Sequence, residues 1–263
     1  TYVVLVLLPI TVLPALLVAP QGVTLDTPRL GLFKALYTLR VNKPFMRLML
    51  ASLFIWTGGH IYNASSLFLV KDALGFSPSM FLWFIVVQYV VGLMMMPFIL
   101  KLGKRIGKHR ALLFVGMSFF LALWLFLFVE PQNTLQVVGV YALKGAVTAA
   151  IWVMPPALVA DSIEHGILKG AGDDTALYMS LYFFVQKLAA AIGVGVALPF
   201  AAYLGFNPQV IDGTTTFEGI KFVSIILPSI VALPAVFLLF NYPIDEKRHA
   251  EIRESLRAKG IET

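Results

Sequence analysis

Two lysines stand out because each lies well inside an apolar run that is long enough to cross a bilayer. Lys144 lies in the run 135–160 and Lys187 lies in the run 176–205. A charged side chain near the bilayer centre costs about 2.5–3.5 kcal/mol on insertion scales. Each amine therefore requires a water-filled cavity, a counter-charge or a polar ligand, or it must lose its proton in a desolvated site.

Polar and aromatic residues recur at helical spacing around these lysines. One stripe in the run 45–70 consists of Trp56, His60, Asn63 and Ser66, and one in the run 135–160 consists of Tyr141, Lys144, Thr148 and Trp152. Tyr182 and Gln186 lie close to Lys187. A polar stripe in lipid must face protein or water, so two alternatives remain: hydrogen bonds between helices, or the lining of a cavity.

Composition argues against catalysis and against nucleic acid. The chain has no cysteine and four histidines, and it lacks metal-ligand spacing, a serine nucleophile elbow and a phosphate-binding glycine motif. We therefore expect no enzyme, no metal site and no cofactor. The net charge of +6 is distributed as membrane topology requires, which disfavours a nucleic-acid partner.

The elements that must position the lysines are membrane-spanning helices. Hydrophobic residues make up 59% of the 263 residues and charged residues 13%, which is typical of a polytopic all-α membrane protein. Because a span needs about 20 apolar residues, we predict seven spans, at 2–19, 45–70, 80–101, 111–129, 135–160, 176–205 and 218–241.

Basic residues predict the orientation of the bundle, because they favour the cytoplasmic side. Sixteen of the 20 lysines and arginines lie in 20–47, 101–110, 161–175 and the tail, and the exceptions are Lys71, Lys144, Lys187 and Lys221. These segments join alternate ends of the spans. Residue 1 is then external, the tail 242–263 is cytoplasmic, and Lys221, near an outer helix end, reaches the interface.

Two segments outside the spans have helical patterns. The segment 20–44 resembles an amphipathic helix on the membrane surface, linking one bundle that ends with the span 1–19 to a second bundle at 45–241. The tail from Asp245 to Lys259 has acids first and bases last and reads as a solvated helix with no chemistry of its own.

Apart from Lys101 and Glu218, which stand at span ends, the spans contain three lysines and no aspartate or glutamate, so counter-ions for Lys144 and Lys187 must come from elsewhere. This pattern predicts half of a site, completed by a missing segment, a partner or a ligand. A retinal protein also has seven spans, but it needs its lysine in the last span and carboxylates facing it.

Four segments resemble the glycoside–pentoside–hexuronide:cation symporters of the major facilitator superfamily, which include the melibiose permeases. They are 159–169 (VADSIEHGILK), 184–193 (FVQKLAAAIG), the basic loop 102–110 (LGKRIGKHR) and 242–251 (YPIDEKRHAE). They occur in the family's order across most of 45–251. The resemblance implies a half-bundle whose seven spans are helices 6–12 of twelve, with 20–44 as the central loop.

The resemblance also implies roles for particular residues. Counted from Asp161, the family's sugar-stacking tryptophan corresponds to Trp152 and its site lysine to Lys187, with Thr148 lining the same cavity. Weaker candidates for the substrate site are Lys144, Gln186, Tyr182, Asn63 and His60. The family's loop glutamate and arginine are replaced by Ile167 and Asp173, so we expect a cytoplasmic gate in which Asp161 pairs with Lys104 or Arg105.

The implied function is the C-terminal half of a cation-coupled sugar symporter in a bacterial inner membrane. The coupling cation, Na⁺, Li⁺ or H⁺, is expected to bind mainly to the missing N-terminal half, and the partners are a small-molecule sugar, the bilayer and that half. Two alternatives stay open: a transporter of the same fold that carries lipid or another non-sugar solute, and a non-transporting receptor or assembly subunit.

Overall fold

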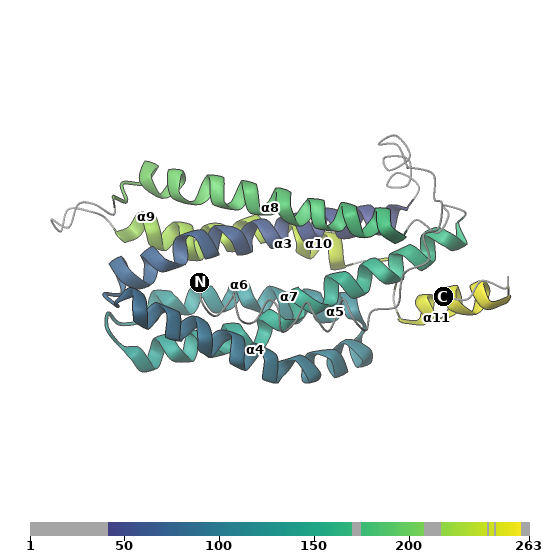
Figure 1. The fold of residues 1–263 in the computed structure, drawn as a ribbon, viewed down its shortest axis with the longest axis horizontal. Helices are drawn as coiled ribbons and strands as arrows, with labels where there is room; N and C mark the ends of the chain where they lie inside the picture. The colour runs from purple at the N-terminus through teal and green to yellow at the C-terminus, as the bar shows by residue number, and fades with distance from the viewer. Residues whose placement is uncertain (1–41, 170–174, 208–216, 241, 245, 259–263) are drawn as a thin grey trace, which may run out of the picture. The chain divides into compact units, whose positions relative to one another are not determined.

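A computed structural model describes residues 42–169, 175–207, 217–240, 242–244 and 246–258. These residues form a helical bundle (Figure 1). Its elements are α3 (Lys43–Phe68), η1 (Leu69–Ala73), α4 (Pro78–Ile106), α5 (Lys108–Ala111), η2 (Leu112–Gly116), α6 (Met117–Leu123), η3 (Trp124–Phe128), α7 (Thr134–Leu168), α8 (Thr175–Tyr203), α9 (Phe217–Lys221), η4 (Phe222–Ile226), α10 (Leu227–Phe240) and α11 (Glu246–Ala258). The predicted span 1–19 and the linker up to residue 41 lie outside the described residues and stay predictions.

The all-α membrane fold predicted from the sequence is confirmed. Within the described residues, five helical stretches are long and apolar enough to cross a membrane: 78–106, 108–128, 134–168, 175–203 and 217–240. Helix α3 occupies the predicted span 45–70 and has 26 residues, about 39 Å at 1.5 Å per residue. It is not among the five because its polar stripe lowers the mean hydropathy of the helix.

Local sequence signals explain where the helices begin. Asn42 caps α3 by accepting a hydrogen bond from the Phe45 backbone N–H at 3.2 Å. Ser77 caps α4 in the same way, and Pro78 occupies the first turn, where its missing N–H costs nothing. Gly107, with φ of 93°, turns the chain sharply between α4 and α5, in a conformation that favours glycine.

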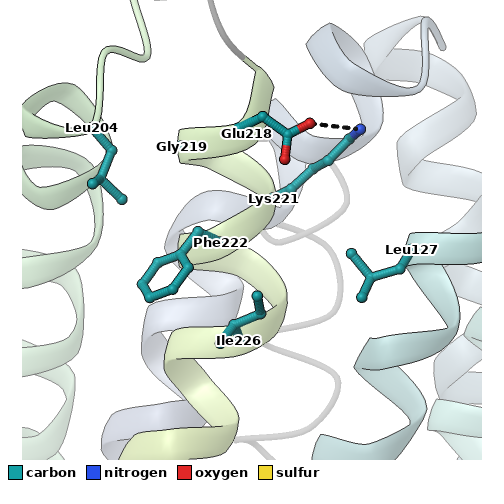
Figure 2. Close-up of a pocket in the computed structure, with 7 residues that line it drawn as sticks. All are labelled: Leu127, Leu204, Glu218, Gly219, Lys221, Phe222 and Ile226. Atoms are coloured by element: carbon teal, nitrogen blue, oxygen red, sulfur yellow. Dashed lines mark ion pairs between the residues drawn. The ribbon is translucent and has the colours of Figure 1, made fainter.

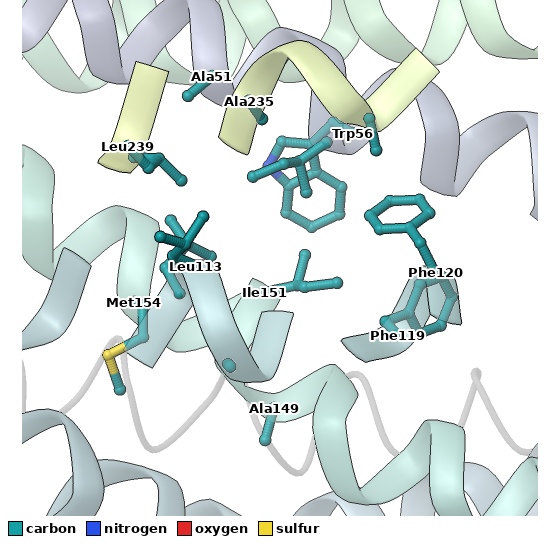
Figure 3. Packing of buried hydrophobic residues seen from close by; sticks show 14 of the residues in the cluster. Ala51, Trp56, Leu113, Phe119, Phe120, Ala149, Ile151, Met154, Ala235 and Leu239 are labelled. Carbon is teal, nitrogen blue, oxygen red and sulfur yellow. The ribbon is translucent and has the colours of Figure 1, made fainter. Parts of the chain in front are cut away.

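The bundle has two groups of closely packed helices. In Figure 1, α3 lies beside α8 and α10, and α4 lies beside α7. Buried aromatic and aliphatic side chains fill the space between the groups, including Trp56 from α3, Phe119 and Phe120 from α6, and Ile151 from α7 (Figure 3). The candidate site residues are therefore held on helices that this core fixes in place.

Helix α7 extends further than predicted. We expected a span at 135–160 followed by a loop from residue 161, but α7 continues to Leu168. The extra turns are held by contacts that the sequence does not reveal: the Asn42 side chain donates to the Ser162 carbonyl at 2.7 Å, and the Ser162 and Tyr242 hydroxyls are 2.8 Å apart. These contacts bury side chains of the segment that was predicted to be a loop, and the segment is helical as a result.

Candidate functional site

A small cavity lies between α3, α4 and α7, and three of the predicted site residues line it. Asn63 comes from α3, and Thr148 and Trp152 come from α7. Gln88 and Tyr89 of α4 also line it and were not predicted. The cavity therefore combines aromatic faces with amide and hydroxyl groups, which is the chemistry that recognises polyhydroxylated solutes.

Two tryptophans form one wall of this cavity. The rings of Trp56 and Trp152 meet edge to face, with centroids 5.0 Å apart and planes at 82°. Trp56 is buried, whereas Trp152 is 53% exposed. Trp56 thus supports the second indole, and the open ring of Trp152 is free to stack against an apolar surface such as the face of a sugar.

A second, larger pocket shares part of this wall. It has a volume of about 270 Å³, compared with about 50 Å³ for the small cavity, and the two share Gln88, Tyr89, Thr148 and Trp152. Gly92, Leu93 and Met96 give the larger pocket an apolar lining. Ligand sites commonly have volumes of about 300–1,000 Å³, so the small cavity by itself is only part of a site.

The remaining candidates on α8 form a separate group. Lys187 is exposed and makes no ion pair with any residue in the described part of the chain, but its charge acts on His60 of α3. Gln186 donates to the Tyr182 hydroxyl at 2.9 Å, and neither residue lines the cavity. The His60 and Trp56 rings, with centroids 6.0 Å apart, connect this group to the tryptophan wall.

Close packing explains why α8 presents this group beside α3. A side-chain carbon added at Gly193 would lie 2.6 Å from the β-carbon of His60 and 2.9 Å from the Thr57 carbonyl oxygen. Glycine at this position lets the two backbones approach, which is the usual role of small residues between membrane helices.

Lys144 is placed differently from the other candidates. It is completely buried and is not among the residues lining the cavity. Its Nζ donates to the Tyr62 hydroxyl and lies 3.9 Å and 4.1 Å from the ring centroids of Tyr62 and Tyr141. Aromatic faces therefore surround the amine, a type of contact that favours a cation.

The predicted partner of Asp161 was wrong. Its carboxylate pairs with Lys108 at 2.6 and 2.8 Å, whereas Lys104 and Arg105 are exposed. The turn at Gly107 is the reason: α4 ends just after Lys104 and Arg105, and α5 begins with Lys108, which reaches Asp161 of α7. This end of the bundle, where α5, the end of α7 and α11 meet, is called the basic end below.

Helix α11 also contributes to the basic end. Its Ile252 and Leu256 are buried, and Arg253 binds Glu164 through Nη2 at 2.9 Å. His249 Nε2 lies 2.8 Å from Glu164 and 3.3 Å from Asp161. The tail was expected to be a solvated helix, but contacts with α7 bury one of its faces.

Another pocket lies at the opposite end of the bundle, beside α9 (Figure 2). Its charged residues are Glu218 and Lys221, which pair at 3.6 Å. Glu218 is largely exposed, and exposed pairs contribute little to stability or binding. Lys221 is partly exposed at this helix end, as its position near the end of a predicted span suggested.

The sequence contained a signal for the missed residues of the cavity. Gln88 is the strongest hydrogen-bonding side chain in the apolar run 80–100, and Tyr89 follows it directly. A polar amide in such a run predicts a side chain that faces protein or water, as the polar stripes on α3 and α7 do. The partner Lys108 could not be separated from its basic neighbours without knowing where α4 ends.

Comparison with known proteins now identifies the class. The family model described as MFS/sugar transport protein matches residues 2–246, so the chain belongs to this family of membrane transporters. The resemblance stated from the sequence motifs is thereby confirmed. The matched family is a transporter family and not an enzyme family.

Three relatives show how far individual proteins have diverged from this chain, with identities of 23–28%. The chain is 28% identical over 245 residues to "Uncharacterized symporter YjmB" of Bacillus subtilis (strain 168), covering 88% of this chain and 50% of that protein. It is 25% identical to "Glucuronide carrier protein homolog" of Escherichia coli (strain K12), with 83% and 48% covered. It is 23% identical to "Sodium-dependent lysophosphatidylcholine symporter 1" of Xenopus tropicalis, with 82% and 41% covered. The chain thus spans about half the length of the curated relatives it matches first.

Proposed function

We propose that this chain forms the C-terminal half of a cation-coupled sugar symporter that works by alternating access. A sugar binds near the midplane between two six-helix halves, and the halves rock around it. The observation that carries this proposal is the half-exposed ring of Trp152, set above Thr148, Asn63 and Gln88 in a cavity too small to enclose a ligand alone. Such a surface suits a substrate that a second half also contacts.

Exposed apolar surface on two helices supports the same arrangement. Trp83 and Leu93 of α4 are 65% and 67% exposed, and Phe184 of α8 is 62% exposed. Helix α4 itself contributes to the cavity, and α8 packs against α3, which also lines it. We propose that the N-terminal half covers these faces on the substrate side and that the coupling cation, Na⁺, Li⁺ or H⁺, binds mainly to that half.

Uptake by the full-length protein in proteoliposomes tests this function. A radiolabelled glucuronide and lactose are the first probes, each measured with proton and sodium gradients. We expect Lys187→Ala and Trp152→Ala to abolish coupled uptake while insertion into the membrane is unchanged. Phe237→Ala on α10, at a position 74% exposed, is the matched control for loss of an exposed aromatic ring. Undiminished uptake by the Lys187 variant contradicts its role.

A lipid-like substrate is the second candidate. It is favoured by the apolar pocket of about 270 Å³ beside the polar cavity and by the lysophosphatidylcholine symporter among the relatives. Competition separates the two: lysophosphatidylcholine, lactose and a glucuronide are added in turn to the uptake assay. Competition by the lipid alone overturns the sugar proposal, and an absence of transport for all three favours a receptor or assembly subunit.

Localisation is part of the proposal. We place the protein in a bacterial inner membrane with the basic end and the C-terminus in the cytoplasm, because most basic residues lie on that side. Fusion of alkaline phosphatase or green fluorescent protein after residue 258 tests it. Fluorescence without phosphatase activity is the expected result, and the reverse pattern contradicts the orientation.

A further inference from the structure

The pocket beside α9, at the end of the bundle opposite the basic end, is not used by the proposed substrate site. It has a volume of about 270 Å³ and is formed by three helix ends, those of η3, α8 and the stretch made of α9 and η4. Among the residues that the structure describes, its lining shares none with the two cavities around Trp152. The pocket is therefore a separate candidate for ligand binding.

This pocket is charged at one end and apolar along the rest of its length. In Figure 2 the pair formed by Glu218 and Lys221 lies at one end. Leu127 and Ile226 lie further along the helices. Ile226 follows Glu218 by eight residues, which is about 12 Å along a helix axis. A phospholipid has the same order of groups, with a charged headgroup followed by apolar chains.

The surroundings of the pocket are those of a membrane–water interface. The stretches 108–128 and 217–240 are both long and apolar enough to cross a membrane, and the pocket lies where the first ends and the second begins. Tyr203 at the end of α8 is 83% exposed, and tyrosine is enriched at this level of membrane proteins. Phe128, next to Leu127, is 79% exposed. The surface beside the pocket thus has the character of one that contacts lipid.

The two charges at the end of the pocket are available to a ligand. Lys221 Nζ lies 3.6 Å from Glu218 Oε1, which is an ion pair but is longer than a hydrogen bond. Neither side chain makes a hydrogen bond with any other residue in the part of the chain that the structure describes. An ammonium group can donate three hydrogen bonds, and a carboxylate can accept several. The pair can therefore bind a cation and an anion of one ligand together.

We propose that this pocket binds one molecule of phosphatidylethanolamine, a zwitterionic phospholipid. The primary ammonium group of the lipid donates hydrogen bonds to the Glu218 carboxylate, and Lys221 donates to the lipid phosphate. One acyl chain runs past Leu127 and Ile226 toward the centre of the membrane. This inference concerns a membrane component and does not depend on which substrate the protein transports.

The headgroup determines which phospholipid binds. An acyl chain is as well solvated in the bilayer as in an apolar pocket, so the lining positions the chain without favouring one phospholipid over another. Phosphatidylglycerol has no cation for Glu218, and the quaternary ammonium group of phosphatidylcholine has no N–H to donate to it. Because Glu218 is 81% exposed, we expect a preference of about two- to fivefold, which is the range of exposed ion pairs.

Photolabelling of the full-length protein in nanodiscs tests this site. A trace of phosphatidylethanolamine with a diazirine in one acyl chain is added to nanodiscs whose bulk lipid is phosphatidylcholine, phosphatidylglycerol or unlabelled phosphatidylethanolamine. Mass spectrometry after irradiation and proteolysis identifies the labelled segments. We expect label in 120–130 and 217–230, and about two- to fivefold less of it when phosphatidylethanolamine is the bulk lipid.

Four variants separate the pocket from its charges. Leu127→Trp fills the pocket and is expected to remove the label from both segments. Glu218→Gln is expected to make the three bulk lipids compete equally, and Glu218→Lys to shift the preference toward phosphatidylglycerol. Glu130→Gln is the matched control, because it neutralises an exposed acid that follows η3 and does not line the pocket. Its labelling should equal that of the unsubstituted protein.

Several outcomes would overturn this inference. One is label spread over the lipid-facing helices without enrichment in the two segments, and another is equal competition by the three bulk lipids in the unsubstituted protein. An absence of label from both segments means that the N-terminal half or another segment covers the pocket. If Leu127→Trp does not assemble, the two Glu218 variants decide the matter, and an unchanged preference in both contradicts the proposed contacts. Since uptake is not measured, none of these results bears on the proposed function.

Discussion

Lys144 and Lys187 are alike in the sequence, but the structure places them in opposite surroundings. Lys144 points into the bundle, where Tyr62 and Tyr141 surround its amine. Lys187 lies on the exposed face of α8, near His60. The depth of a lysine in the membrane is therefore set by its place in the sequence, whereas its chemistry is set by the neighbouring helices.

The largest expected difference between the two lysines is in stability. Lys144→Ala leaves a hole among tightly packed rings, and deletions of buried side chains lower the free energy of unfolding by about 2–5 kcal/mol. Lys187→Ala removes an exposed side chain, with an expected change within about 0.5 kcal/mol. Unfolding of the full-length protein in mixed detergent, followed by tryptophan fluorescence, measures both. Equal losses for the two variants contradict the comparison.

Packing of the two helices that carry these lysines, α7 and α8, provides the next test. A side-chain carbon at Gly145 would collide with the backbone of α4 at Gln88, whereas nothing lies within 4 Å of one at Gly195 on α8. We expect Gly145→Ala to lower the free energy of unfolding by about 1–3 kcal/mol, as overpacking does. Gly195→Ala is the matched control and should be neutral or slightly stabilising. Tolerance of alanine at Gly145 means that α4 and α7 are less closely packed than described.

A third lysine, Lys108, extends the comparison because it has a carboxylate partner. Lys108→Met removes the ion pair of the buried Asp161, leaving His249 at 3.3 Å. An acceptor left without its partner costs about 1–3 kcal/mol of unfolding free energy. Lys104→Met, an exposed neighbour, is the control and should change little. If both substitutions have the same small effect, the pair at the basic end contributes no more than surface charges do.

The smallest expected effect concerns the phenols around Lys144. Tyr141→Phe removes one hydroxyl from the pair at 3.3 Å and should lower the free energy of unfolding by about 1 kcal/mol. Tyr203→Phe, at an exposed position of α8, is expected to have no effect. A double-mutant cycle that combines it with Lys144→Met measures the coupling free energy between the Tyr141 hydroxyl and the Lys144 amine. A coupling energy of zero indicates that the tyrosines only fill space.

The sequence predicted the helices well because apolar length and polar periodicity are local properties. The runs 80–101, 176–205 and 218–241 correspond closely to α4, α8 and the segment 217–240. It was less successful with the end of α7, where Ser162 and Asn42 form contacts between distant segments. The partner of Asp161 depended on the turn at Gly107, and the burial of α11 depended on where α7 ended.

The sequence by itself determined that this is a polytopic helical membrane protein, which residues lie at membrane depth, and which transporter family it belongs to. Hydrophobic length, charge distribution and short motifs carry that information along the chain. Only the tertiary structure decided that Trp152, Thr148 and Asn63 share a cavity with a glutamine of α4. It also decided that the Lys144 amine lies among aromatic rings and outside that cavity. The rotation of each helix about its axis is fixed by packing against other helices, and no local pattern specifies it.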